Sequence, residues 1–339
     1  MPVHLELPEA TLASYLEAHV PGFRGPLTAK KFKGGQSNPT YLIEAASGRC
    51  VLRRKPGGKL LASAHAVDRE FRVLQGLAGS VIPVAQPLHL CADDAVIGSM
   101  FYVMKYVPGR VFWDPSLPEL AREERAAHFE AALDTLAALA QLDVAAAGLG
   151  DYGKPGNYFA RQVSRWSDQY RSAETERIDA METLIAWLPG AVPPDDGRIA
   201  LVHGDFRIDN LIWHADAPRI AAIVDWELST LGHPLADLAY FCMALRLPRN
   251  PVLPGLAGVD RTALGIPDEA VMIERFTGAT NLDPLPHWNF LLAFQFFRLA
   301  AIAQGVLKRA LQGNASNDQA LAAGRMTTAI AELGASAAG

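Results

Sequence analysis

Apolar residues near the start of the chain follow the spacing of a helix. Leu12, Tyr15 and Leu16 fall on one helical face after Pro8, and Pro21 ends the pattern. The spacing predicts a short amphipathic helix that packs against the rest of the protein.

The sequence pattern changes between Lys30 and Met104, where short apolar runs alternate with glycine and proline turns. The runs have the length and composition of strands: Thr40–Ile43, Cys50–Arg53 and Met100–Met104. One helix interrupts them at residues 65–77 (HAVDREFRVLQGL), where the apolar residues share a helical face. The N-terminal third is therefore predicted to be a small antiparallel sheet that carries one helix.

After Pro108 the pattern becomes mostly helical. Periodic segments rich in Ala and Leu occur near residues 119–140, 158–188, 267–278, 285–312 and 317–333. Three strand-like runs interrupt them at residues 199–202, 211–214 and 219–224. The pattern predicts an α+β protein with a small N-terminal sheet lobe, residues 1–107, and a larger, mainly helical C-terminal lobe, residues 108–339.

Composition places the chain among ordinary globular proteins. Half of the residues are hydrophobic, one fifth are charged, and the formal net charge is -5. This balance lacks the basic field that gathers nucleic acid, so a nucleic-acid partner is not expected. The most apolar stretch, residues 290–306, contains Gln295, Arg298 and Gln304, which predicts a buried core helix rather than a membrane span.

The cysteines and the N-terminus indicate where the protein works. Cys50, Cys91 and Cys242 are far apart and form no C-x-x-C motif, which is typical of reduced thiols. The N-terminal segment has acids among its apolar residues and lacks the basic start of a signal peptide. We therefore expect a cytoplasmic protein.

The strongest chemical signal is the segment LVHGDFRIDNLI, residues 201–212, which a further aspartate, Asp225, follows in IVDWE. His203, Asp205 and Asn210 reproduce the H-x-D-x-x-x-x-N spacing of a kinase catalytic loop. Such a loop can present Asp205 to a substrate hydroxyl. Asn210 and Asp225 stand at strand ends, where their oxygen atoms can converge on Mg²⁺. Asp and Asn are also common turn and cap residues, but that explanation is weak for three of them at this spacing.

On these motifs the chain resembles the aminoglycoside phosphotransferase family, also called choline-kinase-like phosphotransferases, over roughly residues 32–311. The segments GGQSNPTYLI, VLRRKPGGKLL, DREFRVL, VHGDFRIDNLI and DWELSTLGHPLADLAY are similar to kinase-like domains fused to, or encoded beside, some acyl-CoA dehydrogenases. The resemblance implies a protein-kinase-like fold with two lobes, ATP and Mg²⁺ as cofactors, and a small hydroxylated molecule as the acceptor of the phosphoryl group.

The resemblance also implies a role for each residue of the loop. Asp205 would act as the catalytic base or orient the acceptor hydroxyl, and Asn210 and Asp225 would bind the metal. His203 is expected to brace the loop rather than to transfer protons. Asp237, in HPLADLAY, either braces the loop from a helix or is a plain surface residue.

A glycine-containing segment between two strand-like runs is a candidate phosphate-binding turn. Its free backbone N–H groups could cover phosphates. The segment consists of Gly34, Gly35, Gln36, Ser37 and Asn38. It departs from the G-x-G-x-x-G motif of protein kinases, and a plain hairpin turn would have the same composition.

The strand that follows offers a cation for the phosphates. Side chains alternate along a strand, so Val51 and Arg53 share one face, and a pocket-lining valine can lie beside a phosphate-directed cation. Protein kinases have lysine at this point, whereas this chain offers Arg53, Arg54 and Lys55. Alternation and the resemblance both favour Arg53.

Two further parts of the small lobe complete the nucleotide site that the resemblance implies. Glu70 matches the glutamate that pairs with the cation, although a lone glutamate on an amphipathic helix is more often a solvated surface residue. The segment Phe101–Val107 resembles the hinge whose backbone binds adenine, with Met104 and Tyr106 as candidate contacts.

Several other classes of enzyme lack their signatures here. The sequence contains no G-x-x-x-x-G-K-[ST] P-loop, no G-x-S-x-G nucleophile and no H-E-x-x-H metal motif. The short interval between Asp225 and Pro234 leaves no room for the activation segment with which protein kinases dock a peptide. A catalytically silent nucleotide-binding module shares the fold and stays an alternative.

Charge indicates the class of the acceptor. An aminoglycoside is polycationic, and its cleft should be rich in carboxylates. Residues 284–317 contain no Asp or Glu, but they include Arg298, Lys308 and Arg309. An anionic or neutral hydroxylated acceptor is therefore favoured over an aminoglycoside or another amino alcohol. With the resemblance, this predicts a hydroxy acid or a hydroxyacyl-CoA.

Overall fold

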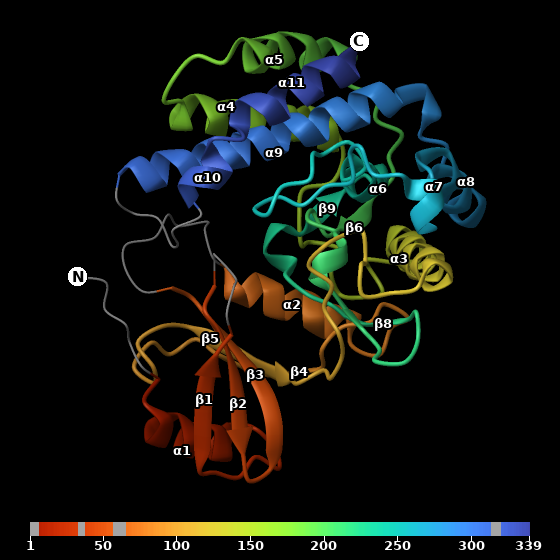
Figure 1. Cartoon of the computed structure of the whole chain (residues 1–339). Coiled ribbons are helices and arrows are strands. Elements are labelled where there is room, and N and C mark those ends of the chain that lie inside the picture. The colour runs from red at the N-terminus through yellow and green to blue at the C-terminus, as the bar shows by residue number, and fades with distance from the viewer. Residues whose placement is uncertain (1–6, 33–37, 57–65, 313–319) are drawn as a thin grey trace. The chain divides into compact units, whose positions relative to one another are not determined.

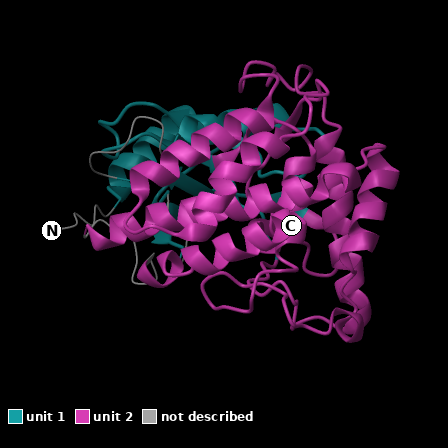
Figure 2. Cartoon of the chain, turned by 90° about the horizontal axis from the view of Figure 1, so that it is seen from above, with its two compact units in different colours: residues 1–109, 221–227 teal, residues 110–220, 228–339 magenta. Residues whose placement is uncertain are grey.

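The computed structural model describes residues 7–32, 38–56, 66–312 and 320–339 (Figure 1). The chain divides into two compact units, which Figure 2 shows in different colours. The first unit comprises residues 1–109 and 221–227, and the second comprises residues 110–220 and 228–339.

One segment groups differently from the predicted lobes. Residues 221–227 follow the predicted boundary near residue 107 by more than a hundred positions, yet they belong to the first unit. Two contacts give the physical reason. The backbone N–H of Ile223 donates a hydrogen bond to Pro83 O at 2.8 Å, and Asp225 Oδ1 lies 2.6 Å from Arg53 Nη2.

The first unit contains the predicted sheet, which is confirmed as five antiparallel strands in the order β1-β2-β3-β5-β4 (Figure 1). The strands are β1 (Leu27–Lys31), β2 (Thr40–Ala45), β3 (Gly48–Arg54), β4 (Pro87–Cys91) and β5 (Phe101–Lys105). Two helices accompany the sheet where the apolar spacing predicts them, α1 (Glu9–His19) and α2 (Val67–Leu77).

Alternation along β3 gives each face of the sheet its own helix. Cys50 and Leu52 are buried in one hydrophobic cluster with Leu12 of α1. Arg53 points to the opposite face, where its guanidinium contacts Glu70 of α2. The helix α1 therefore packs on an apolar face, whereas α2 meets the face that carries charge.

The second unit is mainly helical, as the periodic segments predict. Its helices are α3 (Arg122–Ala140), α4 (Tyr158–Ala173), α5 (Asp179–Ala191), α6 (Leu235–Met243), α7 (Arg261–Leu264), α8 (Glu269–Thr280), α9 (Trp288–Leu311), α10 (Ala320–Gly324) and α11 (Thr327–Ala338). The apolar helix α9 packs against α4, α6 and α11. Residues 285–311 are long and apolar enough to cross a membrane, but 78% of their most apolar part is buried inside the structure, as expected for a core helix.

The predicted helical stretch 158–188 consists of two helices, because α9 binds the end of the first one. Gln304 Nε2 donates a hydrogen bond to Ala173 O at 3.0 Å, and Lys308 Nζ donates one to Ser172 O at 2.5 Å. These side chains satisfy carbonyl groups that a helix end leaves without intrahelical partners. A tertiary contact therefore sets the boundary between α4 and α5.

Short strands hold the loop on which the chemistry is predicted. They are β6 (Ala200–Val202), β7 (Leu211–Trp213), β8 (Ile220–Ile223) and β9 (Thr230–Gly232). The strand β9 pairs antiparallel with β6, and Gly232 lies opposite Ala200. No pattern predicts β9, whose three residues carry no alternation. Its glycine is needed because a Cβ at position 232 would lie 2.5 Å from the ring of Tyr158.

Candidate active site

The loop that leaves β6 is held by a buried carboxylate. Asp237 of α6 is 3% exposed, and its oxygens accept hydrogen bonds from the backbone N–H groups of His203 at 2.6 Å and Gly204 at 2.8 Å. Burial raises the pKa of Asp237, and the His203 ring and the two amides partly offset this effect. Gly204 has φ +82°, and a Cβ there would lie 2.7 Å from Leu228 O. Only glycine fits this turn.

Both oxygens of Asp205 have partners within the second unit. Asn210 Nδ2 donates to Asp205 Oδ2 at 2.9 Å and to Asp205 O at 2.8 Å. The hydroxyl of Tyr240 donates to Asp205 Oδ1 at 2.6 Å. Arg207 Nε forms an ion pair with the same oxygen at 3.2 Å. The structure thus brings the predicted Asp205 and Asn210 together and adds Tyr240 and Arg207, which the sequence analysis missed.

The side chain of His203 is buried and contacts the backbone of its own loop. Its side chain is fully buried, and its Nδ1 accepts a hydrogen bond from the backbone N–H of Asp205 at 3.1 Å. An imidazole that stays in contact with its own loop and away from solvent braces that loop, as the sequence analysis expects.

The oxygen donors present fit a magnesium ion better than a transition metal. Asn210 donates two hydrogen bonds through Nδ2, which leaves its amide oxygen Oδ1 as a candidate metal ligand. Asp225 has φ +65°, a conformation that is uncommon for a residue with a side chain, and its side chain is 31% exposed. In the described part of the chain, no three His, Cys, Asp or Glu residues are grouped as a metal cluster. Amide and carboxylate oxygens that share the metal with phosphates are the ligands that Mg²⁺ prefers.

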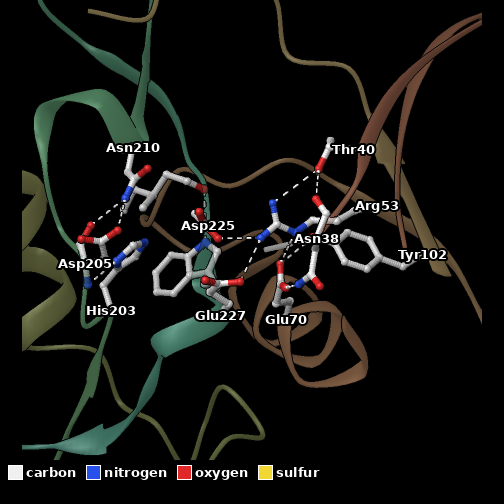
Figure 3. A network of polar contacts seen from close by, with 12 residues as sticks. Asn38, Thr40, Arg53, Glu70, Tyr102, His203, Asp205, Asn210, Asp225 and Glu227 are labelled. Atoms are coloured by element: carbon white, nitrogen blue, oxygen red, sulfur yellow. Dashed lines mark hydrogen bonds and ion pairs between the residues drawn. The ribbon is translucent and has the colours of Figure 1, made fainter. Parts of the chain in front are cut away.

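In the first unit, Arg53 joins three acidic side chains (Figure 3). Its guanidinium lies 2.8 Å from Glu70 Oε2, 2.6 Å from Asp225 Oδ1 and 3.6 Å from Glu227 Oε2. Burial lowers the pKa of Arg53, but the carboxylates of Glu70 and Asp225 outweigh this effect and leave the pKa above its usual value. The charged cation can therefore persist in a site where its side chain is only 11% exposed.

The neighbouring Arg54 points to the other face of β3. It is 3% exposed, and its Nε donates a hydrogen bond to Ser99 Oγ at 2.9 Å. Burial lowers its pKa. Strand alternation thus turns Arg53, and not Arg54, toward the acidic cluster.

Glu70 is buried with a full set of partners. It is 1% exposed, accepts a hydrogen bond from Asn38 Nδ2 at 2.7 Å and another from the Tyr102 hydroxyl at 3.2 Å, and pairs with Arg53. A solvated surface position is therefore wrong for this residue. The Asn38 side chain is 2% exposed and is directed to Glu70, so any contact with a phosphate would fall to its backbone. The rest of the predicted turn, Gly34, Gly35, Gln36 and Ser37, lies outside the described residues.

The remaining predicted nucleotide contacts lie on two adjacent strands. Val51 of β3 is 8% exposed and stands opposite Met104 of β5 in the antiparallel ladder. Tyr106 follows the end of β5, and the guanidinium of Arg49 lies 4.5 Å from the centre of its ring. The three residues are therefore near neighbours on the paired strands β3 and β5 and the segment that follows β5.

The cavities lined by described residues of the second unit include a small one and a larger one. One, of about 40 Å³, is lined by Arg207 and Tyr240, which both contact Asp205. A larger one, of about 340 Å³, is lined by Tyr158 and His233, and none of the residues that contact Asp205 lines it. The smaller cavity is thus the one adjacent to the predicted base.

Comparison with known sequences gives one family and several longer relatives. The profile of the phosphotransferase enzyme family matches residues 28–270. The chain is 46% identical over 331 residues to acyl-CoA dehydrogenase family member 10 of Mus musculus. This alignment covers 97% of this chain and 31% of that protein. It is 40% identical over 329 residues to acyl-CoA dehydrogenase family member 11 of Homo sapiens. This alignment covers 96% of this chain and 42% of that protein. The chain thus spans less than half of the length of either relative.

Solved structures show the same fold. A Ralstonia eutropha protein, provisionally described as an aminoglycoside phosphotransferase, has a TM-score of 0.88 and 46% identity, with 98% of each chain covered. A thermostable mutant of aminoglycoside phosphotransferase APH(4)-Ia, in complex with ADP and hygromycin B, has a TM-score of 0.63 and 14% identity, with 96% of this chain and 98% of that chain covered. At this low identity the second likeness shows the fold alone.

The acidic cluster around Arg53 leads to a prediction about stability. We expect Arg53→Met to lower the free energy of unfolding by about 3 to 5 kcal/mol, because the buried carboxylate of Glu70 would lose its counter-charge. Denaturant unfolding measures this change. The control Arg49→Met, at an exposed position of the same strand, should lower it by less than about 1 kcal/mol, the usual worth of an exposed cation–π contact. Equal stability of the Arg53 variant and the wild type would contradict the prediction.

Proposed function

Since the chain belongs to the phosphotransferase enzyme family, we propose that it is a small-molecule kinase that transfers the γ-phosphoryl group of ATP to a hydroxyl group. One observation carries the proposal. The Asp205 carboxylate is held through both oxygens on a loop whose backbone Asp237 binds. A carboxylate in this state can orient an acceptor hydroxyl and take its proton as the hydroxyl oxygen attacks phosphorus.

The predicted site residues supply the proposed ligands of the nucleotide. Arg53 is the proposed partner of the phosphates, with Glu70 fixing its guanidinium. Asn210 Oδ1 and the Asp225 carboxylate are the proposed ligands of Mg²⁺, which when bound would neutralise charge on the phosphates. Phosphoryl transfer depends mainly on such positioning and charge neutralisation, so the protein needs no covalent intermediate.

Two of the cations from which the sequence analysis predicts an anionic acceptor, Arg298 and Lys308, contact other residues inside the second unit. Arg298 is 6% exposed and lies over the rings of Trp166 and Tyr240. Lys308 Nζ donates a hydrogen bond to Ser172 O. These charges stabilise helix packing, so they give no support for a negative charge on the acceptor.

The lining of the small cavity beside Asp205 supports an apolar group near the reacting hydroxyl of the acceptor instead. Its walls are mostly hydrophobic and include Phe129, Phe241, Leu245, Leu247 and Leu256. Its one acidic side chain, Asp209, is paired with Arg207 at 3.0 Å. A polycationic aminoglycoside would find no unpaired carboxylate in this cavity. The relatives are named as members of the acyl-CoA dehydrogenase family, and this also favours an acceptor that contains an acyl group. We propose a hydroxy acid or a hydroxyacyl-CoA as the acceptor class.

The role of Asp205 predicts a specific loss of rate. Asp205→Asn should lower kcat by roughly 10²- to 10⁴-fold, the usual effect of removing a positioned acid or base. ATP binding should be nearly unchanged, because the substitution keeps the shape of the side chain. Steady-state kinetics and calorimetric titration with an ATP analogue measure the two quantities. A variant with wild-type kcat would remove Asp205 from the mechanism.

A second substitution tests the metal site. Asp225→Ala should raise the Mg²⁺ concentration needed for half-maximal binding of an ATP analogue, because one of two protein oxygen ligands is lost. Titration of Mg²⁺ at fixed nucleotide, followed by fluorescence or calorimetry, measures this. Asp209→Ala is a matched control, since that carboxylate is paired with Arg207. An unchanged Mg²⁺ requirement in the Asp225 variant would count against its assignment.

The acceptor class is tested by ADP release with ATP, Mg²⁺ and a panel of hydroxylated compounds. We expect hydroxyacyl-CoA compounds to be phosphorylated faster than kanamycin-like amines, because the cavity beside Asp205 is apolar. Faster turnover of the amines would overturn the acceptor proposal but keep the kinase. Nucleotide binding without turnover of any acceptor would favour the catalytically silent module.

A further inference from the structure

A tyrosine hydroxyl lies directly on the predicted catalytic carboxylate. Tyr240 is 5% exposed, and its hydroxyl donates to Asp205 Oδ1 at 2.6 Å, a short bond of the charge-assisted kind. Burial, and then the charge of Asp205, raise the pKa of Tyr240 well above its usual value. The hydroxyl therefore keeps its proton at neutral pH and can only donate to the carboxylate.

The helix α6 holds the loop at two points from one face. Tyr240 and Asp237 are three residues apart on α6, so their side chains project on the same side. Asp237 binds the backbone of the loop at His203 and Gly204, while Tyr240 binds the Asp205 side chain. The carboxylate and the peptide that carries it thus share one rigid support.

The long helix α9 in turn fixes this part of α6. Gln295 Nε2 donates a hydrogen bond to Ala236 O at 2.8 Å, and both groups are buried. The guanidinium of Arg298 lies 5.4 Å from the centre of the Tyr240 ring and 5.5 Å from that of Trp166. These contacts restrain the tyrosine ring, so its hydroxyl has one position available.

Each oxygen of the carboxylate has one hydrogen-bond donor from a neighbouring side chain. The Tyr240 hydroxyl donates to Oδ1, and Asn210 Nδ2 donates to Oδ2. Arg207 Nε lies 3.2 Å from Oδ1 as an ion-pair partner. Because each carboxylate oxygen has two lone pairs, the two hydrogen bonds fix the orientation of the carboxylate and still leave it able to take a proton.

We propose that Tyr240 is a positioning residue that binds Asp205 Oδ1 and thereby fixes the orientation of the carboxylate that takes the proton of the acceptor hydroxyl. The proposal rests on the kinase function proposed above and adds a residue that acts through Asp205. In the transfer step the acceptor O–H bond breaks, its proton moves to the Asp205 carboxylate, the acceptor oxygen bonds to phosphorus, and the bond from phosphorus to the ADP oxygen breaks.

The test is Tyr240→Phe, which removes the hydroxyl and keeps the ring over which Arg298 lies. We expect kcat to fall by roughly 10- to 100-fold, because a misplaced catalytic group costs about that much. KM for ATP and the melting temperature should stay close to their wild-type values. The matched control is Tyr152→Phe, which removes another buried hydroxyl of this unit, bonded to Ser229 Oγ at 2.8 Å and not to Asp205. Its kcat should remain that of the wild type.

A double-mutant cycle separates positioning from a general structural effect. If Tyr240 acts through Asp205, Tyr240→Phe should change the single-turnover rate of the Asp205→Asn protein by less than about threefold, since coupled residues are non-additive. A full additional loss in that background would overturn the proposal, as would wild-type kcat in Tyr240→Phe alone. Absence of turnover by the wild-type protein with every acceptor would instead remove the kinase function, and this role with it.

Discussion

The second unit depends on a carboxylate that has been taken out of water. Asp237 can be buried only because two backbone N–H groups, those of His203 and Gly204, point at its oxygens. Losing either partner would leave a buried polar group unsatisfied, at a cost of about 1 to 3 kcal/mol. The requirement ties the start of α6 to the end of β6. It also explains the glycine at position 204, since any Cβ there would meet Leu228 O. The loop that carries Asp205 thus has little freedom before any substrate arrives.

In the first unit, the corresponding constraint is a buried cation that needs acidic partners. Arg53 lies between the carboxylates of Glu70 and Asp225, which come from a helix and from a segment far along the sequence. A guanidinium in this position needs negative partners, and those carboxylates need the cation. The pairing draws residues 221–227 into the first unit and places a proposed metal ligand beside a proposed phosphate ligand. Asn38 and Tyr102 complete the hydrogen bonds of Glu70 and make the cluster a single network.

Much of the architecture could be predicted from patterns of the chain. Alternation predicts the strands of the small sheet and turns Arg53 away from Arg54, because a one-residue step reverses the side chain. Helical spacing predicts α1, α2 and most helices of the second unit. The division between α4 and α5 could not be predicted in this way, because side chains of α9 bind the carbonyl groups that end α4. The strand β9 could not be predicted from the sequence either, since a three-residue strand shows too little alternation to be recognised.

For the candidate site, the sequence by itself determined the residue types and spacing of a phosphotransferase loop, and with them the family. It did so because the H-x-D-x-x-x-x-N pattern is local, confined to a few consecutive residues. Only the tertiary structure decided that Tyr240 binds Asp205, that Asn38 turns inward to Glu70, and that Arg298 lies over the ring of Tyr240. Each of these contacts joins residues 30 or more positions apart. Folding alone brings such residues together, so no local pattern of the chain records them.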